Sequence, residues 1–308
     1  MKIIVTGALG HIGSYVLRQL PLNFPGAEII LIDNLMTQRF ISIFNLPKIG
    51  SYKFFDKDVT NSDLDEIFEN SNFVIHLAAI TDAAGSFERQ EELEKNNFIA
   101  TKKIADLCLK KKIKLITLSS TSVYGTQNLV VAENCSIEEL KPQSPYAVTK
   151  LKEEEYVQKL CFEKGLNAII FRFGTIFGIS PGIRFHTAVN KFCWQAVMSE
   201  PITVWKTAYD QKRPYLDLKD ASNAFIHAIN NLQFDGKVYN VLTLNATVRQ
   251  IVETIREFIP FLDIQFVDNK IMNQLSYEVS CERFIQTGFY FNGNLKSSIG
   301  DTINLLNH

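Results

Sequence analysis

Short apolar runs recur through the first 174 residues of the chain. They lie at 2–6, 28–33, 52–55, 72–77, 113–118 and 168–173. Runs of this length that are rich in isoleucine, leucine, valine and phenylalanine are typical of strands buried on both faces of a sheet. The pattern therefore predicts a sheet with these six strands.

Segments with apolar residues at helical spacing separate these runs. They lie at 11–20, about 61–68, 88–112 and 145–164. Ser144 and Pro145 mark the start of the last segment, because proline fits the first turn of a helix, where its missing N–H costs nothing. Strands that alternate with helices run parallel, since each helix returns the chain to the same edge of the sheet. We therefore expect a doubly wound α/β fold.

The pattern becomes less regular after residue 174. Pro181, Pro201, Pro214 and Pro260 interrupt short predicted helices and strands there. We expect residues 1–174, rejoined by about 213–243, to form the sheet domain. Residues 175–308 are expected to form a smaller lobe over the carboxyl ends of the strands.

Composition and charge exclude several classes of protein. With 46% hydrophobic and 21% charged residues, the chain has enough apolar material for a core. Its 32 basic and 33 acidic residues leave a net charge of −1, so nothing predicts binding to nucleic acid or to an acidic membrane. The absence of a long apolar run or a secretion signal predicts a cytoplasmic protein. The five cysteines and five histidines show no metal-ligand spacing, so we expect no metal.

A glycine pattern follows the first predicted strand. Gly7, Gly10 and Gly13 lie between that strand and the first helix, where glycine lets the backbone approach a pyrophosphate. Asp33 ends the second strand, where a carboxylate binds the ribose hydroxyls of NAD and repels the 2′-phosphate of NADP. The pattern favours NAD. NADP stays open because Arg39 lies nearby and could offset the repulsion.

Ser120, Tyr146 and Lys150 form the candidate catalytic set. Tyr146 and Lys150 lie one helical turn apart, so the ammonium can sit beside the phenol. At ~4 Å and an effective dielectric constant of ~20, this charge would supply about the 4 kcal/mol that brings the tyrosine pKa near neutrality, and the cationic ring of oxidised nicotinamide would add to it. Ser120 would hydrogen-bond the substrate oxygen as it becomes a carbonyl. Tyr215 and Lys219 repeat the spacing, but in the later lobe, where we expect Tyr215 to be a packing residue.

These motifs resemble the extended short-chain dehydrogenase/reductases, the family of NAD-dependent nucleotide-sugar epimerases and dehydratases. The matching segments lie at 6–13, 33–35, 76–79, 119–125, 146–150 and 213–217. The resemblance implies a Rossmann domain that binds NAD and a lobe that binds a nucleotide-diphosphate sugar. It also implies a homodimer formed through the helices at about 88–112 and 145–164.

The resemblance further implies which residues bind each ligand. Those for the cofactor are Gly7, Gly10, His11, Ile12, Gly13, Asp33, Asn34, Asp58, Val59, Leu77, Ala78, Ala79, Thr81, Asn97, Tyr146, Lys150 and Phe173. Those for the substrate are Thr81, Ser122, Thr175, Arg184, Asn190 and Arg213. Arg213 matches the family's arginine that grips the diphosphate, a task that suits a bidentate guanidinium.

The two residues that follow Ser120 indicate which reaction of this family the chain catalyses. Family members that are 4,6-dehydratases carry Asp-Glu there, and nucleotide-sugar decarboxylases keep the Glu, whereas this chain has Thr121 and Ser122. Neither is a carboxylic acid, so we expect a nucleotide-sugar epimerase that oxidises a sugar hydroxyl to a ketone and reduces it again. A net NAD-dependent dehydrogenase or keto-sugar reductase stays open, as does an enzyme like sulfoquinovose synthase, which residues 190–197 resemble. A non-catalytic NAD-binding sensor is a third alternative.

Overall fold

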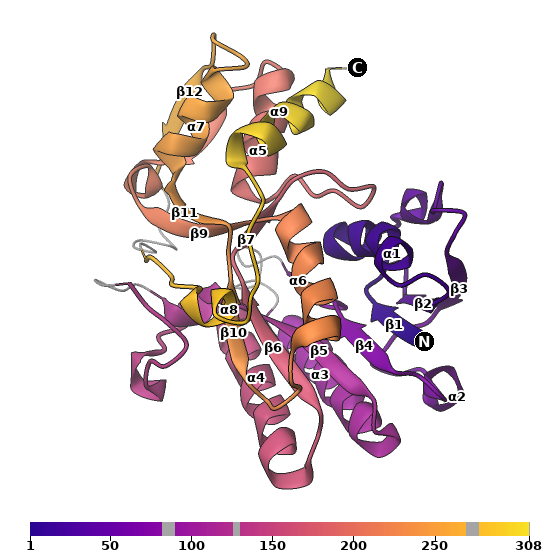
Figure 1. The fold of residues 1–308 in the computed structure, drawn as a ribbon. Helices are drawn as coiled ribbons and strands as arrows, with labels where there is room; N and C mark the ends of the chain where they lie inside the picture. The colour runs from indigo at the N-terminus through magenta and orange to yellow at the C-terminus, as the bar shows by residue number, and fades with distance from the viewer. Residues whose placement is uncertain (82–89, 126–129, 269–276, 308) are drawn as a thin grey trace.

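A seven-stranded parallel sheet forms the centre of the molecule (Figure 1). The computed structural model describes the whole chain except residues 82–89, 126–129, 269–276 and 308. Along the sheet, the strands are β10 (Val238–Val241), β6 (Ala168–Phe173), β5 (Lys114–Ser120), β4 (Phe73–His76), β1 (Lys2–Thr6), β2 (Glu28–Asp33) and β3 (Ser51–Asp56). The doubly wound α/β prediction is confirmed. The chain order reverses between β1 and β4, where the connections leave the sheet toward opposite faces and open a crevice.

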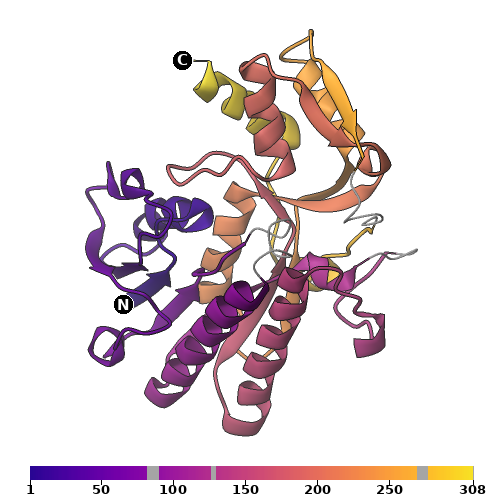
Figure 2. The ribbon, with the colours of Figure 1, turned by 180° about the vertical axis from the view of Figure 1, so that it is seen from behind.

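Helices cover both faces of this sheet, as Figures 1 and 2 show from opposite sides. α1 (His11–Asn23) and α6 (Leu218–Asn231) pack on one face, and α3 (Gln90–Lys111) and α4 (Pro145–Lys164) pack on the other. Ile3 and Val5 of β1 join the first apolar core and Ile4 joins the second, as the alternation of side chains along a strand requires. The first two residues of the helix predicted at 88–112 lie outside the described residues.

The helix predicted at about 61–68 is shorter than the sequence suggested. α2 covers only Asp65–Phe68. Asp58 accepts hydrogen bonds from the backbone and hydroxyl of Thr60, and Asp63 accepts one from the Asp65 amide. These side-chain bonds to nearby amides stabilise turns in place of the first helical turn.

The remaining elements form a second body at the carboxyl ends of the strands, in the upper part of Figure 1. Its strands are β7 (Thr175–Phe177), β9 (Lys212–Asp217) and β11 (Leu244–Thr247) in one sheet, and β8 (Ile202–Trp205) and β12 (Ile264–Val267) in another. Its helices include α5 (Ala188–Val197), α7 (Val248–Arg256) and α9 (Leu295–Leu306), which surround a third apolar core. The segment predicted to rejoin the sheet domain is divided, because β10 pairs with β6 whereas β9 lies in the three-stranded sheet.

Short helical elements complete the fold. They are α8 (Glu282–Ile285), η1 (Phe40–Ile43), η3 (Thr121–Tyr124), η4 (Ile137–Glu139) and η5 (Lys206–Ala208). Within the residues described above, no helix is both long enough and apolar enough to cross a membrane.

Candidate active site

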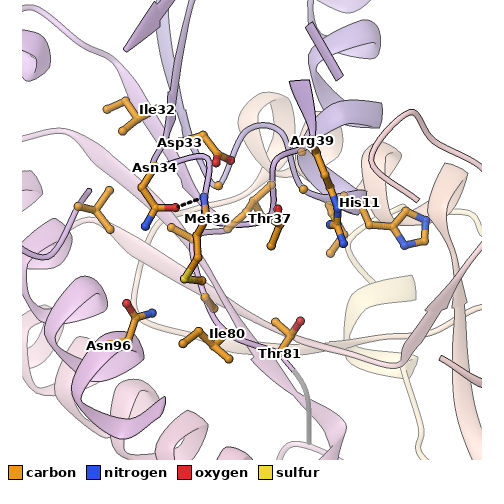
Figure 3. Close-up of a pocket in the computed structure, with 18 of the residues that line it drawn as sticks. His11, Ile32, Asp33, Asn34, Met36, Thr37, Arg39, Ile80, Thr81 and Asn96 are labelled. Atoms are coloured by element: carbon orange, nitrogen blue, oxygen red, sulfur yellow. Dashed lines mark hydrogen bonds between the residues drawn. The ribbon is translucent and has the colours of Figure 1, made fainter. Parts of the chain in front are cut away.

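A pocket of about 410 Å³ opens at the carboxyl ends of β1, β2 and β4, where the strand order reverses (Figure 3). Most of the predicted cofactor residues line it, namely Gly7, Gly10, His11, Ile12, Gly13, Asp33, Asn34, Asp58, Val59, Leu77, Ala78, Ala79 and Thr81. In Figure 3, Asp33, Asn34 and Arg39 lie on one side of this space, and Ile80, Thr81 and Asn96 lie on the other. Segments far apart in the sequence thus line one pocket.

Two glycines let the backbone pack closely beside this pocket. Gly7 has a φ of +64°, and a Cβ on it would lie 2.7 Å from backbone atoms of Leu77 and Ala78. A Cβ on Gly13 would lie 2.6 Å from the carbonyl oxygens of Gly7 and Ala8. A side chain at either position would push the turn away from β4 or from α1. The absence of side chains here fits close approach of a pyrophosphate to the start of the helix.

Acidic groups border the end of the pocket beyond β2 and β3. The two carboxylate oxygens of Asp33 accept hydrogen bonds from the amides of Leu9 and Leu35, at 2.9 and 3.0 Å. Asp58 accepts a hydrogen bond from the side chain of Asn34 at 3.1 Å. Asp33 therefore joins the glycine turn to β2 and presents its carboxylate at the pocket, where ribose hydroxyls could donate to it. Arg39 also lines the pocket, so the feature that kept NADP open persists in the structure.

The candidate catalytic residues lie on α4 and at the end of β5, two elements that pack against each other. Ser144 caps α4 by accepting a hydrogen bond from the Ala147 amide at 3.2 Å, which places Tyr146 and Lys150 in the first turns of the helix. The Lys150 Nζ lies 6.0 Å from the centre of the Tyr146 ring. It donates to the carbonyl of Leu118 on β5 at 3.0 Å, two residues before Ser120. The fold thus brings the ammonium and the phenol to the strand that carries the serine.

The charge balance around Tyr146 differs from the sequence expectation. Lys150 is 4% exposed and forms an ion pair with Glu153, which is 2% exposed, at 2.9 Å. Burial raises the pKa of Tyr146 above its ordinary value and Glu153 raises it further, although Lys150 and Arg184 act in the opposite direction. Lys150 therefore lowers the pKa of Tyr146, as the spacing predicts, but burial outweighs this effect. Burial also disfavours charge on Lys150, but Glu153 and Tyr146 keep its pKa above the ordinary value.

Three predicted binding residues lie behind the pocket surface. The side-chain amide of Asn97 bonds both backbone groups of Ile80, at 2.8 Å each. Phe173 packs in the apolar core of the sheet. Asn190 is fully buried and bonds backbone groups of Gly178 and Arg184. None of the three lines the pocket of Figure 3, and their contacts with a ligand stay a prediction.

The predicted substrate residues are spread along the approach to this site. Thr81 and Arg184 line the pocket and hydrogen-bond to each other. Ser122 donates to the Ser120 hydroxyl at 2.9 Å. Thr175 and Arg213 lie on the paired strands β7 and β9 and do not line the pocket of Figure 3.

Several pocket residues escaped sequence reasoning. They are Ile32, Met36, Thr37, Lys57, Ile80 and Asn96. Met36 and Thr37 directly follow Asp33 and Asn34, so their place in the chain could have suggested them. No local pattern marks Asn96, which α3 brings to the site.

The buried histidines His76 and His11 lead us to expect that the folded protein is less stable at acidic pH. Burial, and then the nearby Lys150 charge, lower the pKa of His76 from 6.5 to about 3, and burial lowers that of His11 to the same value. Below pH 6.5 the unfolded chain therefore takes up protons that the folded chain refuses. The free energy of unfolding should fall toward pH 3 by up to about 1.4 kcal/mol per pH unit for each histidine.

Urea denaturation between pH 7 and pH 5 measures this effect. His76→Asn should give a shallower pH dependence, because asparagine does not titrate. Equal slopes for the variant and the wild type would show that His76 does not contribute.

The sequence of this chain is similar to those of known proteins. The model of a family described as "NAD dependent epimerase/dehydratase family" matches residues 3–241. The trifunctional UDP-glucose 4,6-dehydratase/UDP-4-keto-6-deoxy-D-glucose 3,5-epimerase/UDP-4-keto-L-rhamnose-reductase RHM2 of Arabidopsis thaliana is 28% identical over 98% of this chain. This match spans only 46% of that protein. The uncharacterized UDP-glucose epimerase YtcB of Bacillus subtilis is 29% identical over 78% of this chain and 76% of its own length.

A solved structure shares the whole fold. It is the UDP-glucuronic acid 4-epimerase of Bacillus cereus in complex with UDP-glucuronic acid and NAD, with a TM-score of 0.88. The two chains are 23% identical, and the match covers 99% of this chain and 100% of the other. At this identity the likeness establishes a common fold.

Proposed function

Because this chain belongs to the NAD dependent epimerase/dehydratase family, we propose that it is an NAD-dependent epimerase of a nucleotide-diphosphate sugar, acting in the cytoplasm. The observation that carries the choice of reaction is the pair of hydroxyl residues after Ser120. Thr121 donates to the carbonyl of Phe173 at 3.3 Å, and Ser122 donates to Ser120. Neither position offers the carboxylic acid that elimination of water requires. These contacts favour oxidation and re-reduction of one sugar carbon.

The pocket fits NAD. The close-packed turn at Gly7 and Gly13 suits the pyrophosphate, and Asp33 suits the ribose hydroxyls. Leu77, Ala78 and Ala79 present small or apolar groups along the opposite wall. When bound, NAD would accept a hydride from the sugar carbon and return it.

In the proposed mechanism, Ser120 and Tyr146 act on the oxygen of the reacting sugar carbon. The Ser120 oxygen accepts hydrogen bonds from the Ser122 amide and hydroxyl, so its own O–H is directed to another acceptor, the sugar oxygen. The ionised Tyr146 oxygen takes the proton of the sugar hydroxyl and later returns it. Lys150 stabilises the phenolate by its charge, and Leu118 holds the ammonium in place.

The nucleotide sugar is assigned to the smaller lobe of residues 175–308. Arg213 on β9 offers a bidentate guanidinium for the diphosphate. Arg184, which belongs to the lobe, lines the pocket together with Thr81 and donates a hydrogen bond to it. Ser122 and Thr175 complete the proposed substrate contacts. UDP-sugars are the first candidates, because the solved relative described above binds one.

Incubation with NAD and a panel of UDP-, GDP-, CDP- and dTDP-sugars tests the proposal, with products resolved by NMR. An epimerase should produce a stereoisomer without accumulating the absorbance of reduced nicotinamide. Accumulation of that absorbance would favour a net oxidoreductase. Binding of NAD without any product from the panel would favour the sensor.

Asp33 should decide the choice between NAD and NADP. Replacing it by asparagine keeps an acceptor oxygen for only one of the Leu9 and Leu35 amides, and it removes the charge that repels a 2′-phosphate. We expect Asp33→Asn to weaken NAD binding about tenfold and to strengthen NADP binding, since Arg39 remains. Calorimetric titration of both cofactors measures this, with the exposed Asp56→Asn as control. Unchanged affinities would remove Asp33 from the cofactor site.

The homodimer stays a prediction, and its expected interface is formed by α3 and α4. Both helices lie on one face of the sheet and expose apolar side chains, among them Ile99 and Val148. Light scattering at micromolar concentration should give the mass of two chains, and Ile99→Glu should shift the mass toward one chain. A single-chain mass for the unaltered protein would contradict the prediction.

A further inference from the structure

Glu153 places a buried carboxylate directly against the candidate catalytic lysine. Its Oε2 atom accepts hydrogen bonds from the Lys150 Nζ at 2.9 Å and from the Thr101 hydroxyl at 2.8 Å. Its other carboxylate oxygen has no hydrogen-bond partner among the described residues. A buried carboxylate is costly unless its charge is used or balanced, so this contact calls for a physical role.

A directional chain of hydrogen bonds ends on the same oxygen. Because Thr101 donates to Glu153, it must accept from His76 Nε2, 3.3 Å away. His76 Nδ1 then accepts from the Thr6 hydroxyl at 2.7 Å, and Thr6 accepts from the Ala78 amide at 3.4 Å. Every donor points toward Glu153, which stabilises a negative charge there.

This chain supports a fixed charge better than a proton path. His76 is 4% exposed, and its low pKa of about 3 keeps it neutral at physiological pH. Thr6 and Thr101 are also buried. The chain ends at the backbone amide of Ala78 in the pocket wall, which cannot take up a proton.

The same contacts fix the Lys150 ammonium. Two of its three N–H groups are directed to the Leu118 carbonyl and to Glu153, which holds the ammonium in one place. The other charged groups nearby are Arg184, whose charge lowers the pKa of Tyr146, and Glu154, whose charge is matched by Arg172. Glu153 is thus the direct counter-charge of the lysine.

We propose that Glu153 is a positioning residue that holds the Lys150 ammonium beside Tyr146 and offsets part of its charge, so that it sets the pH at which Tyr146 loses its proton. The inference rests on the proposed function, in which Tyr146 is the base. It predicts that loss of the Glu153 charge makes the phenol more acidic, because the ammonium then acts on it without opposition.

Glu153→Gln isolates the charge. Both existing hydrogen bonds go to a single oxygen, so the glutamine oxygen can keep both while the charge disappears. Ultraviolet titration of tyrosinate, with the signal of Tyr146→Phe subtracted, should show the Tyr146 midpoint lowered by about one pH unit. The acid limb of the pH–rate profile should move down by the same amount. The titration is read with and without NAD, so it does not depend on finding the substrate.

Two matched variants separate charge from other effects. Glu155→Gln makes the same change at an exposed position of α4 and should leave the midpoint unchanged. Thr101→Val removes a hydrogen bond to Glu153 but keeps both charges, so its midpoint should stay near that of the wild type. A Thr101→Val shift as large as that of Glu153→Gln would overturn the role of charge.

The remaining outcomes are also decisive. An unchanged Tyr146 midpoint in Glu153→Gln would overturn the proposal. A raised midpoint would also overturn it, because it would mean that Lys150 had lost its own proton. If the glutamine variant does not fold, Glu153→Met, of similar length and without a buried amide, should show the same downward shift. A lowered midpoint in a protein without epimerase activity would support the role of Glu153 and contradict the proposed function.

Discussion

Tyr146→Phe is expected to lower kcat about 10³-fold while leaving the KM and the affinity for NAD nearly unchanged. The phenylalanine ring keeps the packing of the tyrosine ring in the first turn of α4 but has no oxygen to exchange a proton with the sugar hydroxyl. Ser120 and Lys150 remain in place, so the loss reports on proton transfer alone. Steady-state kinetics with the substrate found in the sugar panel, together with calorimetric titration of NAD, measure both quantities.

Tyr215→Phe provides the matched control. Tyr215 has the same spacing to Lys219 as Tyr146 has to Lys150, yet it lies in β9 with 1% exposure and packs in the core of the smaller lobe. Its location confirms that it is a packing residue, and we expect this variant to keep its activity. Full activity of Tyr146→Phe, or a comparable loss in Tyr215→Phe, would remove Tyr146 from the role of base.

Glu154→Ala is expected to lower the free energy of unfolding by about 3–5 kcal/mol. Glu154 is 2% exposed, and its two oxygens accept hydrogen bonds from Arg172 Nε at 2.9 Å and Nη2 at 2.6 Å. Arg172 also donates to the Tyr124 hydroxyl at 2.9 Å. Without Glu154, the guanidinium remains charged in a buried place between α4 and β6 and lacks its counter-charge. Urea denaturation at neutral pH measures the loss.

Two further variants identify the cause of this loss. Glu155→Ala removes an exposed carboxylate from the same helix and should change the free energy of unfolding by less than about 0.5 kcal/mol. Glu154→Ala combined with Arg172→Met should recover much of the stability, since no unpaired charge is then buried. A double variant as unstable as Glu154→Ala would show that packing, and not the unpaired charge, causes the loss.

The candidate site was predictable where local sequence carries the chemistry. The glycine turn, Asp33 and the Tyr146–Lys150 pair follow from spacing along one strand or one helix, and the structure places the first two at the pocket. A sequence motif does not tell which way a side chain points, so only the structure shows that Asn97 bonds the backbone of Ile80 and that Asn190 bonds the backbone of Gly178 and Arg184. Glu153 lies three residues from Lys150 on the same helix, so the pair could have been noticed from spacing.

The sequence by itself determined the parallel sheet, the helices on its two faces and the start of α4. These features follow from the local sequence. The spacing of apolar residues sets the strands and helices, Ser144 caps α4, and the stereochemistry of the crossover connections makes the strands parallel. Only the tertiary structure decided the electrostatics of the site. It joins Thr6, His76, Thr101 and Glu153 from four separate elements and buries Tyr146 and Lys150 beside them. Burial and long-range contacts govern how readily a group ionises, and neither is encoded in local spacing.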